Sequence, residues 1–479
     1  MSTSTPAPET PLGSYALQWQ SANPGQSGFL PLVRGIEGLG ARLRALDAAQ
    51  LSVDAQYFLI KPDEAGRLFL GKLLVAADRG VKVRLLVDDI FTPRDDRVLA
   101  TLASHPNIQI RLFNPLSRRV PAALHMLWDF GRTNRRMHNK SFLVDGAAAI
   151  VGGRNIAEEY FELKAEDNFN DLEVLAVGPV VTDLYASFDS FWNSELSLPV
   201  EGLGRQAEPA AMDRWRKIMQ DVMDGNRPSA YARAVNSDFL RRLFRGELNP
   251  QAATARVVSD APEKLNMPPG AEQHLAVADA LVEAFLGVKR EATIITPYFL
   301  PRERARKLMI ELASKGMRIR VVTNSLASTN HVPVHAHYRK YRRELLHAGV
   351  EIYEMRADRR PGFRKRNGTE YMTLHTKAFE LDGETLALGS VNLDPRSIEM
   401  NTELVLFIDS PQLSRQLRYF LGRDLPAHTW RLVLDERGRE RWYFDGAGEP
   451  EVVRREPGAS LWRRAWVGLY RLLPIERLL

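Results

Sequence analysis

The chain has 479 residues, more than a single hydrophobic core usually serves, so we expect at least two domains. It contains no cysteine, which excludes disulfides, thiolate metal ligands and cysteine nucleophiles. The net charge of +6, from 65 basic and 59 acidic residues, is too small to choose between nucleic acid and anionic lipid as a partner. Because no signal peptide and no run of about 18 uncharged apolar residues is present, we expect no membrane-spanning helix.

The first half of the chain alternates between strand and helix patterns. Residues 1–25 are rich in Ser, Thr, Pro and Gly, and we expect a flexible lead-in there. Apolar spacing then predicts a helix over 36–49, a strand over 51–60, a helix over 66–77 and a strand over 81–89. A strand, a helix and a second strand form the unit from which parallel sheets are built.

A short segment after this unit carries a His-x-Lys-x4-Asp motif, made of His138, Lys140 and Asp145. Residues two apart in an extended strand face the same side, so the imidazole and the ammonium project into one pocket. A glycine turn follows the hairpin and carries Gly153 and Asn155. Such a turn can bring backbone N–H groups and a side-chain amide close to a phosphate.

The same motif returns in the second half as His375, Lys377 and Asp382. Its hairpin also ends in a glycine turn, which carries Ser390 and Asn392. In the first copy a glycine stands where the second copy has Ser390, so one hydroxyl that could contact a phosphate is absent there. We expect Asn155 and Asn392, with the residues at the Gly153 and Ser390 positions, to bind substrate.

The elements before the second motif repeat those before the first. We predict a strand over 292–300, a helix ending at residue 314 and a strand over 315–325. The motif histidines are 375 − 138 = 237 residues apart, and the Tyr-Phe-Leu segments of the corresponding strands are 298 − 57 = 241 apart. A nearly constant offset over several elements indicates an internal duplication.

This duplication sets the expected division of the chain. We expect a first domain over 26–200 and a second over 266–428, separated by an Arg-rich helical insertion over 201–265. Residues 429–479 follow the second domain. Two alternating runs around a Glu-Arg-Gly turn predict a hairpin over 430–444.

The last predicted element is an amphipathic helix over 461–473, which Pro474 ends. Val467 is the one apolar residue on its polar half. Aromatic residues opposite arginine are typical of a helix that lies in a membrane interface, and the alternative is a helix that packs on the protein's own core. The apolar half consists of Leu461, Trp462, Ala465, Trp466, Leu469, Tyr470, Leu472 and Leu473, and the polar half contains Arg463, Arg464 and Arg471.

Two converging His-Lys pairs favour displacement at a phosphodiester. One imidazole attacks phosphorus and forms a phosphohistidine, and the other protonates the leaving alcohol. The lysines and asparagines offset charge on the phosphate oxygens. We expect no metal and no cofactor, so activity should survive chelation. The alternative, two ordinary buried hairpins with incidental His and Lys, requires the motif and its turn to coincide twice.

A nucleophilic imidazole needs an acceptor on its second nitrogen. Asp171 and Glu403 lie downstream of the two hairpins, each on an apolar, strand-like segment. We assign Asp171 to His138 and Glu403 to His375. The alternative is that both carboxylates are charges at strand edges.

The paired motifs with their Gly and Asn turns resemble the phospholipase D superfamily over most of the chain. The resemblance implies two duplicated phospholipase D-like α/β/α sandwich domains with the active site at their interface. Six segments look like bacterial cardiolipin synthases of the C type: 83–89, 135–140, 152–155, 323–327, 394–397 and 401–403.

The expected function follows from the activity of this family. The resemblance implies a phosphatidyltransferase that makes cardiolipin from phosphatidylglycerol and a second phospholipid, typically phosphatidylethanolamine, through a phosphohistidine. It implies that His138 is the nucleophile and His375 the general acid and base. It also implies a peripheral enzyme at the surface of the bacterial inner membrane, on the cytoplasmic side, with no nucleic acid as partner. The sequence identifies no protein partner. The expected catalytic set is His138, Lys140, Asp145, Asp171, His375, Lys377, Asp382 and Glu403.

Two other functions stay open from the sequence. A phosphodiesterase of the same superfamily would hydrolyse phospholipid or nucleic acid, and a nuclease needs a basic groove with interleaved aromatic residues. Arginine clusters at 132–136, 339–343 and 359–366 are either solvated helical faces or a rim for phosphorylated substrates. A non-catalytic lipid-binding scaffold is the third function, and the two intact motifs argue against it.

Overall fold

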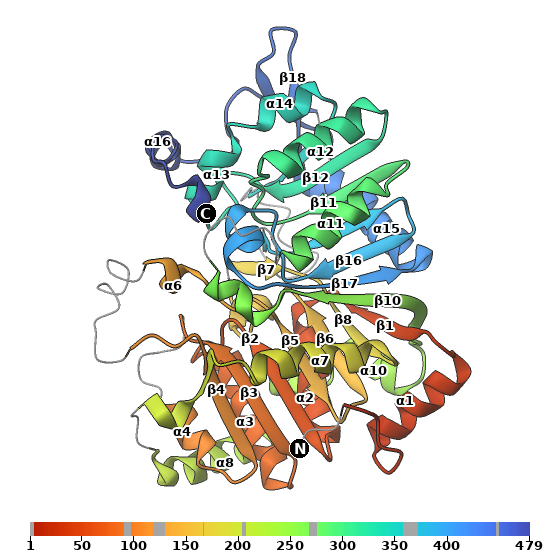
Figure 1. Ribbon diagram of the computed structural model, residues 1–479, viewed down its shortest axis with the longest axis vertical. Helices are drawn as coiled ribbons and strands as arrows, with labels where there is room; N and C mark the ends of the chain where they lie inside the picture. The colour runs from red at the N-terminus through yellow and green to blue at the C-terminus, as the bar shows by residue number, and fades with distance from the viewer. Residues whose placement is uncertain are drawn as a thin grey trace.

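One mixed sheet runs through both halves of the chain, with helices on both of its faces (Figure 1). The halves join at β10 (Gln251–Ser259), which pairs antiparallel with β1 (Ser27–Leu32) of the first half and with β17 (Leu404–Asp409) of the second. The computed structural model describes residues 4–90, 97–117, 130–165, 167–203, 207–267, 275–357, 372–446 and 450–479.

In the first half, β2, β3 and β4 pair in parallel and the other neighbours are antiparallel. Outward from β1 the order is β8 (Glu173–Val177), β6 (Ala148–Gly152), β5 (Ser141–Val144), β2 (Ser52–Tyr57), β3 (Lys82–Asp88), β4 (Ile108–Phe113) and β9 (Ser197–Pro199).

The second half repeats this order, which confirms the duplication. Here β11, β12 and β13 are the parallel strands. A separate two-stranded sheet pairs β7 (Asn168–Asn170) with β14 (Met372–Leu374). Outward from β17 the order is β16 (Thr385–Gly389), β15 (Ala378–Leu381), β11 (Glu291–Ile295), β12 (Arg318–Asn324), β13 (Glu351–Met355), β18 (Thr429–Leu434), β19 (Glu440–Phe444) and β20 (Glu451–Val453).

The strand residues alternate between two apolar layers. In β3, Leu85 packs with the helices on one face of the sheet, and Leu86 packs on the other face, as the period of two requires. The second of these cores is continuous across both halves. The predicted α/β/α arrangement is therefore confirmed. The first face is covered by α2 (Gly35–Ala48), α3 (Glu64–Asp78), α11 (Ala276–Leu286) and α12 (Glu303–Ser314), and the second by α7 (Val180–Trp192) and α15 (Pro411–His428).

Two predictions about the connecting segments are wrong. The lead-in is not flexible throughout, because residues 11–22 form α1 (Pro11–Ala22), whose first turn is capped by the Thr10 hydroxyl. The segment 201–265 is helical only in part, since its end forms β10 in the shared sheet. Alanines supply several of the apolar positions of β10, and their small side chains make a weak strand pattern. The helical part consists of α8 (Pro209–Met223), α9 (Tyr231–Val235) and α10 (Asp238–Phe244).

The predicted C-terminal hairpin is confirmed as β18 and β19. The helix that follows, α16 (Leu461–Tyr470), lies on the outside of the second half beside α13 (Val332–Tyr338) (Figure 1). Within the described ranges, no helix combines the length and the apolar content that crossing a bilayer requires. The other α-helices of the described residues are α4 (Arg97–Ala103), α6 (Phe130–Asn134) and α14 (Arg342–His347).

Candidate active site

The first motif is held by a segment of the second half. Met137 forms a parallel bridge with Thr402, and the N–H of His138 donates to the carbonyl oxygen of Thr402 at 3.0 Å. The N–H of Thr402 donates in turn to the carbonyl oxygen of Arg136 at 3.0 Å. Strand-like pairing thus joins the start of the first motif to the chain just before β17.

The second motif is held in the same way by the first half. β14, which leads into the motif, pairs in parallel with β7. The N–H of His375 donates to the carbonyl oxygen of Asn170 at 2.7 Å. The two motifs therefore meet at the boundary between the halves.

The carboxylates cross between the halves. The Nδ1 atom of His138 lies 2.9 Å from Oε2 of Glu403, and the Nδ1 atom of His375 lies 2.6 Å from Oδ2 of Asp171. The sequence-based pairing of Asp171 with His138 and of Glu403 with His375 is therefore wrong, since the partners are exchanged. The segments just before β8 and β17 lie outside the main sheet, and each contacts the motif of the other half. This pairing is long-range, so proximity in sequence does not reveal it.

Burial keeps both imidazoles neutral. It lowers the pKa of His138 to about 4 and the pKa of His375 to about 3, although the carboxylate beside each ring acts in the opposite direction. Burial also opposes ionisation of Asp171 and Glu403, but the neighbouring cations hold the pKa of each below its ordinary value. Each carboxylate is therefore an acceptor for an Nδ1–H, which leaves Nε2 of each ring unprotonated. Nε2 of His375 lies 3.3 Å from Nζ of Lys377.

Two lysines share the buried site. The Nζ atom of Lys140 donates to the carbonyl oxygen of His138 at 2.5 Å, and Nζ of Lys377 donates to that of His375. Burial lowers the pKa of Lys140 to about 7 and that of Lys377 to about 8. Each lysine also lowers the pKa of the histidine in the opposite motif, so the charge of each half-site affects the histidine of the other. A bound phosphodiester anion would offset the cost of burying these cations.

Aromatic rings pack against both imidazoles, and only one of these rings lies in a repeated sequence pattern. Phe58 meets the His138 ring edge to face, with centroids 5.0 Å apart. Phe169 stacks on the His375 ring at 5.0 Å, and Tyr160 meets it edge to face at 5.0 Å. The signal for Phe58 was its place in the duplicated Tyr-Phe-Leu segment, whereas the other two precede Asp171 without a repeated pattern.

The aspartates of the two motifs do not reach the site. Asp145 accepts hydrogen bonds from the backbone N–H groups of Gln50, Leu51 and Ser52 at 2.8 to 2.9 Å. Asp382 accepts equivalent bonds from residues 289–291 at 2.8 to 2.9 Å. Five strand residues at about 3.3 Å each place the carboxylate roughly 16 Å along the chain from its lysine. Asp145 and Asp382 therefore cap the starts of β2 and β11, and their assignment to the catalytic set is wrong.

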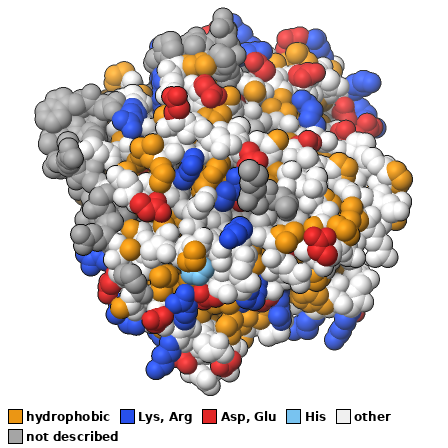
Figure 2. Space-filling view, turned by 60° about the horizontal axis from the view of Figure 1, so that its bottom comes forward, with side chains coloured by type: hydrophobic (Ala, Val, Ile, Leu, Met, Phe, Trp, Pro, Cys, Tyr) orange, Lys and Arg blue, Asp and Glu red, His pale blue; other side chains and the backbone are white. Residues whose placement is uncertain are grey.

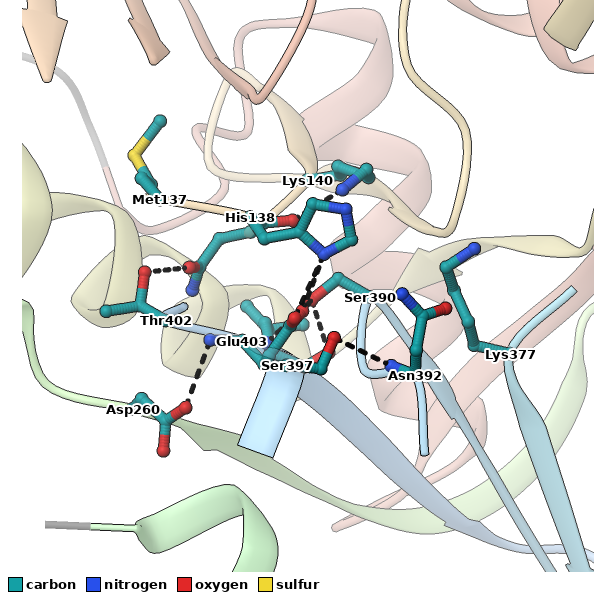
Figure 3. Close-up of polar contacts among 12 residues, drawn as sticks. Met137, His138, Lys140, Asp260, Lys377, Ser390, Asn392, Ser397, Thr402 and Glu403 are labelled. Atoms are coloured by element: carbon teal, nitrogen blue, oxygen red, sulfur yellow. Dashed lines mark hydrogen bonds and ion pairs between the residues drawn. The ribbon is translucent and has the colours of Figure 1, made fainter. Parts of the chain in front are cut away.

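Ser390 and Gly153 lie against the two carboxylates, Glu403 and Asp171. The hydroxyl of Ser390 donates to Glu403 and accepts from the N–H of Leu404 at 3.0 Å (Figure 3). A Cβ at position 153 would lie 2.4 Å from Oδ1 of Asp171, so only glycine leaves room for this carboxylate. Both positions therefore lie against a carboxylate, and the direct substrate contact expected of them stays a prediction.

The asparagines of the two turns keep an unused acceptor. Asn155 donates from Nδ2 to the Tyr160 hydroxyl at 3.0 Å, and its Oδ1 has no partner in the described residues. Asn392 also has a buried Oδ1 with no partner among the described residues, and it lies beside Lys377 (Figure 3). Both side chains are therefore available to a ligand in the site, each at the same place in its half.

Two further residues position the motifs, and both lie in segments that resemble cardiolipin synthases, 83–89 and 323–327. Asp88, at the end of β3, accepts from the N–H of Met137 at 2.9 Å. Asn324, at the end of β12, accepts from the N–H of Leu374 at 3.1 Å. Each motif histidine thus follows a residue whose backbone is fixed by the equivalent strand end. The offset of 324 − 88 = 236 residues matches the duplication and is the signal that could have identified the pair.

The central arginines of the two basic clusters that the structure describes are bonded within the protein. Arg136 is buried and donates to the carbonyl oxygen of Asn114 at 3.0 Å. Arg342 is buried among Glu354, Glu440 and Glu456. The third cluster, at 359–366, lies outside the described residues. Over the described ranges, no group of three or more His, Asp or Glu side chains is placed to hold a metal ion.

Comparison with known proteins agrees with this geometry. The family model for the cardiolipin synthase, phospholipase D-like domain matches residues 43–192 and 281–425. Cardiolipin synthase C of Escherichia coli K12 is 37% identical over 473 residues, which cover 98% of this chain and 99% of that protein. Cardiolipin synthase A of Pseudomonas syringae is 25% identical over 397 residues, which cover 82% of this chain and 67% of that protein.

The fold has a solved counterpart. The crystal structure of phosphatidylserine synthase from Haemophilus influenzae covers 97% of this chain, with a TM-score of 0.60 and 14% identity, over 99% of its own length. At this identity the likeness concerns the fold alone. Two matched copies of the domain, a relative similar over almost its whole length and the paired motifs lead to one conclusion: the chain belongs to the cardiolipin synthase family with phospholipase D-like domains.

Proposed function

We propose that the protein is a phosphatidyltransferase that makes cardiolipin from phosphatidylglycerol and a second phospholipid, with phosphatidylethanolamine as the donor. The observation that carries the proposal is the pair of crossed histidine–carboxylate contacts at the boundary between the halves. Similarity to cardiolipin synthase C over almost the whole chain supports the choice of lipid. Each contact joins a histidine of one half to a carboxylate of the other, so the reaction requires both halves of the chain.

In the first step, Nε2 of His138 attacks the phosphorus of the donor lipid. A phosphorus–nitrogen bond forms, and the bond to the head-group oxygen breaks. His375 supplies the proton to the leaving alcohol. Its pKa is low in the free site because the ring is buried, and the charge of a bound phosphodiester favours its protonation. Glu403 stabilises the positive charge that develops on the attacking ring.

In the second step, a hydroxyl of phosphatidylglycerol attacks the phosphohistidine. His375 accepts the proton of that hydroxyl, and the phosphorus–nitrogen bond breaks to release cardiolipin and free His138. Lys140 and Lys377 offset the charge on the phosphate oxygens in both steps, with the amides of Asn155 and Asn392. Water in place of the lipid hydroxyl would give phosphatidic acid, so the acceptor decides between transfer and hydrolysis.

The proposal places the protein at the cytoplasmic surface of the bacterial inner membrane. Donor and acceptor are both bilayer lipids, so the site must work against a lipid surface. Nucleic acid is not the proposed substrate. On the face shown in Figure 2, Lys and Arg side chains are interspersed with acidic and hydrophobic ones and do not form one basic groove.

The test uses purified enzyme, labelled phosphatidylglycerol and excess chelator, with and without phosphatidylethanolamine. We expect cardiolipin, with release of ethanolamine when the second lipid is present. His138→Ala and His375→Ala should each abolish turnover, and only the His375 variant should carry a phosphatidyl adduct by mass spectrometry. His347→Ala, on α14 and outside both motifs, is the matched control and should keep full activity. Phosphatidic acid as the main product would replace transfer with hydrolysis, and an adduct on His375 would reverse the roles.

A further inference from the structure

Helix α16 is attached to the protein by its polar side. Arg463 donates to the carbonyl oxygens of Leu326, Ala327 and Thr329 at 2.7 to 3.0 Å. Val467, the apolar residue on this side, is fully buried. The Ser460 hydroxyl accepts from the N–H of Arg463 at 3.2 Å and caps the helix, which is therefore formed and docked in the protein alone.

The apolar side of α16 faces outward. A docked amphipathic helix normally turns this side to the core. Here the two tryptophans are exposed, Trp462 by 77% and Trp466 by 48%. We call the exposed apolar set of α16 and of the turn that follows it the docking face; it consists of Leu461, Trp462, Trp466, Leu469, Leu472 and Leu473. A cluster of large exposed apolar side chains marks an interaction surface.

The segment that carries the docking face is basic. Residues 452–479 contain six arginines and two glutamates. Both glutamates have cationic partners, since Glu456 is buried against Arg342 and Glu476 accepts from Lys340 at 3.1 Å. The exposed charges are therefore basic: Arg454, Arg455, Arg471 and Arg477. Tryptophan and leucine flanked by arginine suit the interface of a bilayer that contains anionic phospholipid.

The loop that holds α16 also holds the second motif. The carbonyl oxygen of Ser328 accepts from the Thr373 hydroxyl at 3.0 Å, between the three carbonyls that bind Arg463. Asn324 bonds both the N–H and the carbonyl of Leu374, the residue before His375, at 2.9 to 3.1 Å. A helix fixed to this loop is therefore fixed relative to the catalytic strand.

We propose that the docking face of α16 binds the surface of a bilayer containing anionic phospholipid and holds the active site in a set orientation to it. The orienting role rests on the proposed function, whereas the binding does not. Two arguments favour lipid over protein as the occupant: the tryptophan and arginine composition, and the bilayer location of the proposed substrates. The helix lies in the interface by one face, because its other face stays on the protein.

The experiment measures sedimentation of the full chain with vesicles. Vesicles of phosphatidylglycerol and phosphatidylcholine in equal parts should bind the wild type, less strongly as salt rises, and pure phosphatidylcholine should bind it less. We expect the triple variant Trp462→Ser, Trp466→Ser and Leu469→Ser to lower the partition coefficient at least about 100-fold, because it removes three large apolar side chains from the area that the bilayer buries. Its melting temperature without lipid should stay at the wild-type value.

The matched control removes three equally exposed apolar side chains elsewhere. Phe244, Leu286 and Tyr419 are 67%, 63% and 68% exposed, and changing all three to Ser should leave the partition coefficient unchanged. Unchanged binding of the α16 variant would overturn the proposal. So would a sharply lowered melting temperature, which would show that the face packs on the protein, or a wild-type dimer that the variant abolishes, which would assign the face to a second copy.

A soluble short-chain phospholipid separates this proposal from the proposed function. On that substrate the α16 variant should turn over at the wild-type rate, and on vesicles it should lose most of its activity. Absence of turnover by the wild type on both substrates would remove the proposed function and leave the sedimentation result to decide the docking face.

Discussion

Each motif imidazole contacts a carboxylate that the other half of the chain supplies. We predict that Glu403→Gln and Asp171→Asn each lower kcat by about 10²–10⁴-fold, because the amide cannot stabilise a charged ring. The crossing itself is tested in protein labelled with 15N-histidine. Glu403→Gln should remove the hydrogen-bonded Nδ1–H signal assigned to His138, and Asp171→Asn the one assigned to His375. The opposite assignment would restore the pairing expected from the sequence.

Substitutions at Gly153 and at Ser390 should lower kcat by different amounts. Gly153→Ala places a Cβ 2.4 Å from Oδ1 of Asp171, so we expect kcat to fall at least about 100-fold as the carboxylate is displaced. Ser390→Ala removes one hydrogen bond to Glu403 and should cost about tenfold, the worth of one charge-assisted bond. Steady-state kinetics on both variants, with the reverse substitution Ser390→Gly as control, checks the order. Equal losses would contradict it.

Asp394 makes stability depend on pH. Burial raises its pKa to about 7, so the folded state holds a proton that the unfolded chain releases near pH 4. Its favourable contribution is complete below the unfolded pKa and is lost as the pH rises through about 7. Asp394→Asn should therefore gain on the order of 2 kcal/mol more stability relative to wild type at pH 8 than at pH 5. Melting of both proteins at the two pH values is the measurement, and a difference independent of pH would contradict the assignment.

At the scale of elements, the first strand of each motif hairpin follows the motif lysine and ends at a structural aspartate. Asp145→Ala leaves three backbone N–H groups without an acceptor and should destabilise the protein by about 3 kcal/mol or more. Asp382→Ala, the matched change at a more exposed turn, should cost less. The protein that remains folded should keep its kcat in both cases, which chemical denaturation and active-site titration together can show. Loss of kcat at full stability would return these residues to the catalytic set.

Local patterns predicted the elements well and their contacts less well. The duplicated strand–helix–strand units and both motif hairpins follow from periodicity and spacing, because each is fixed by neighbours in sequence. The partners of His138 and His375 are 265 and 204 residues away, and no local pattern distinguishes the two pairings. In α16, periodicity identified the apolar face but not which face docks, since that depends on the carbonyl groups that Arg463 finds on a distant loop.

At the scale of the whole molecule, β10 and the core around it make the two halves one folding unit. Ala253 on β10 is buried in the core that contains residues of both halves, such as Val174 and Leu406. An Ala253→Asp substitution places an unpaired charge there. It should lower the melting temperature of the whole protein in a single transition.

Hydrogen exchange shows whether the halves respond together. In the Ala253→Asp protein, β2 of the first half and β11 of the second should lose protection by the same factor, because opening the shared core exposes both sheets. Ala292→Asp, at a buried alanine of a core that contains only second-half residues, is the comparison. If Ala253→Asp produced two separate melting transitions, the halves would be independent domains. The crossed carboxylates would then have to form after each half had folded, and the active site would assemble by docking of finished domains.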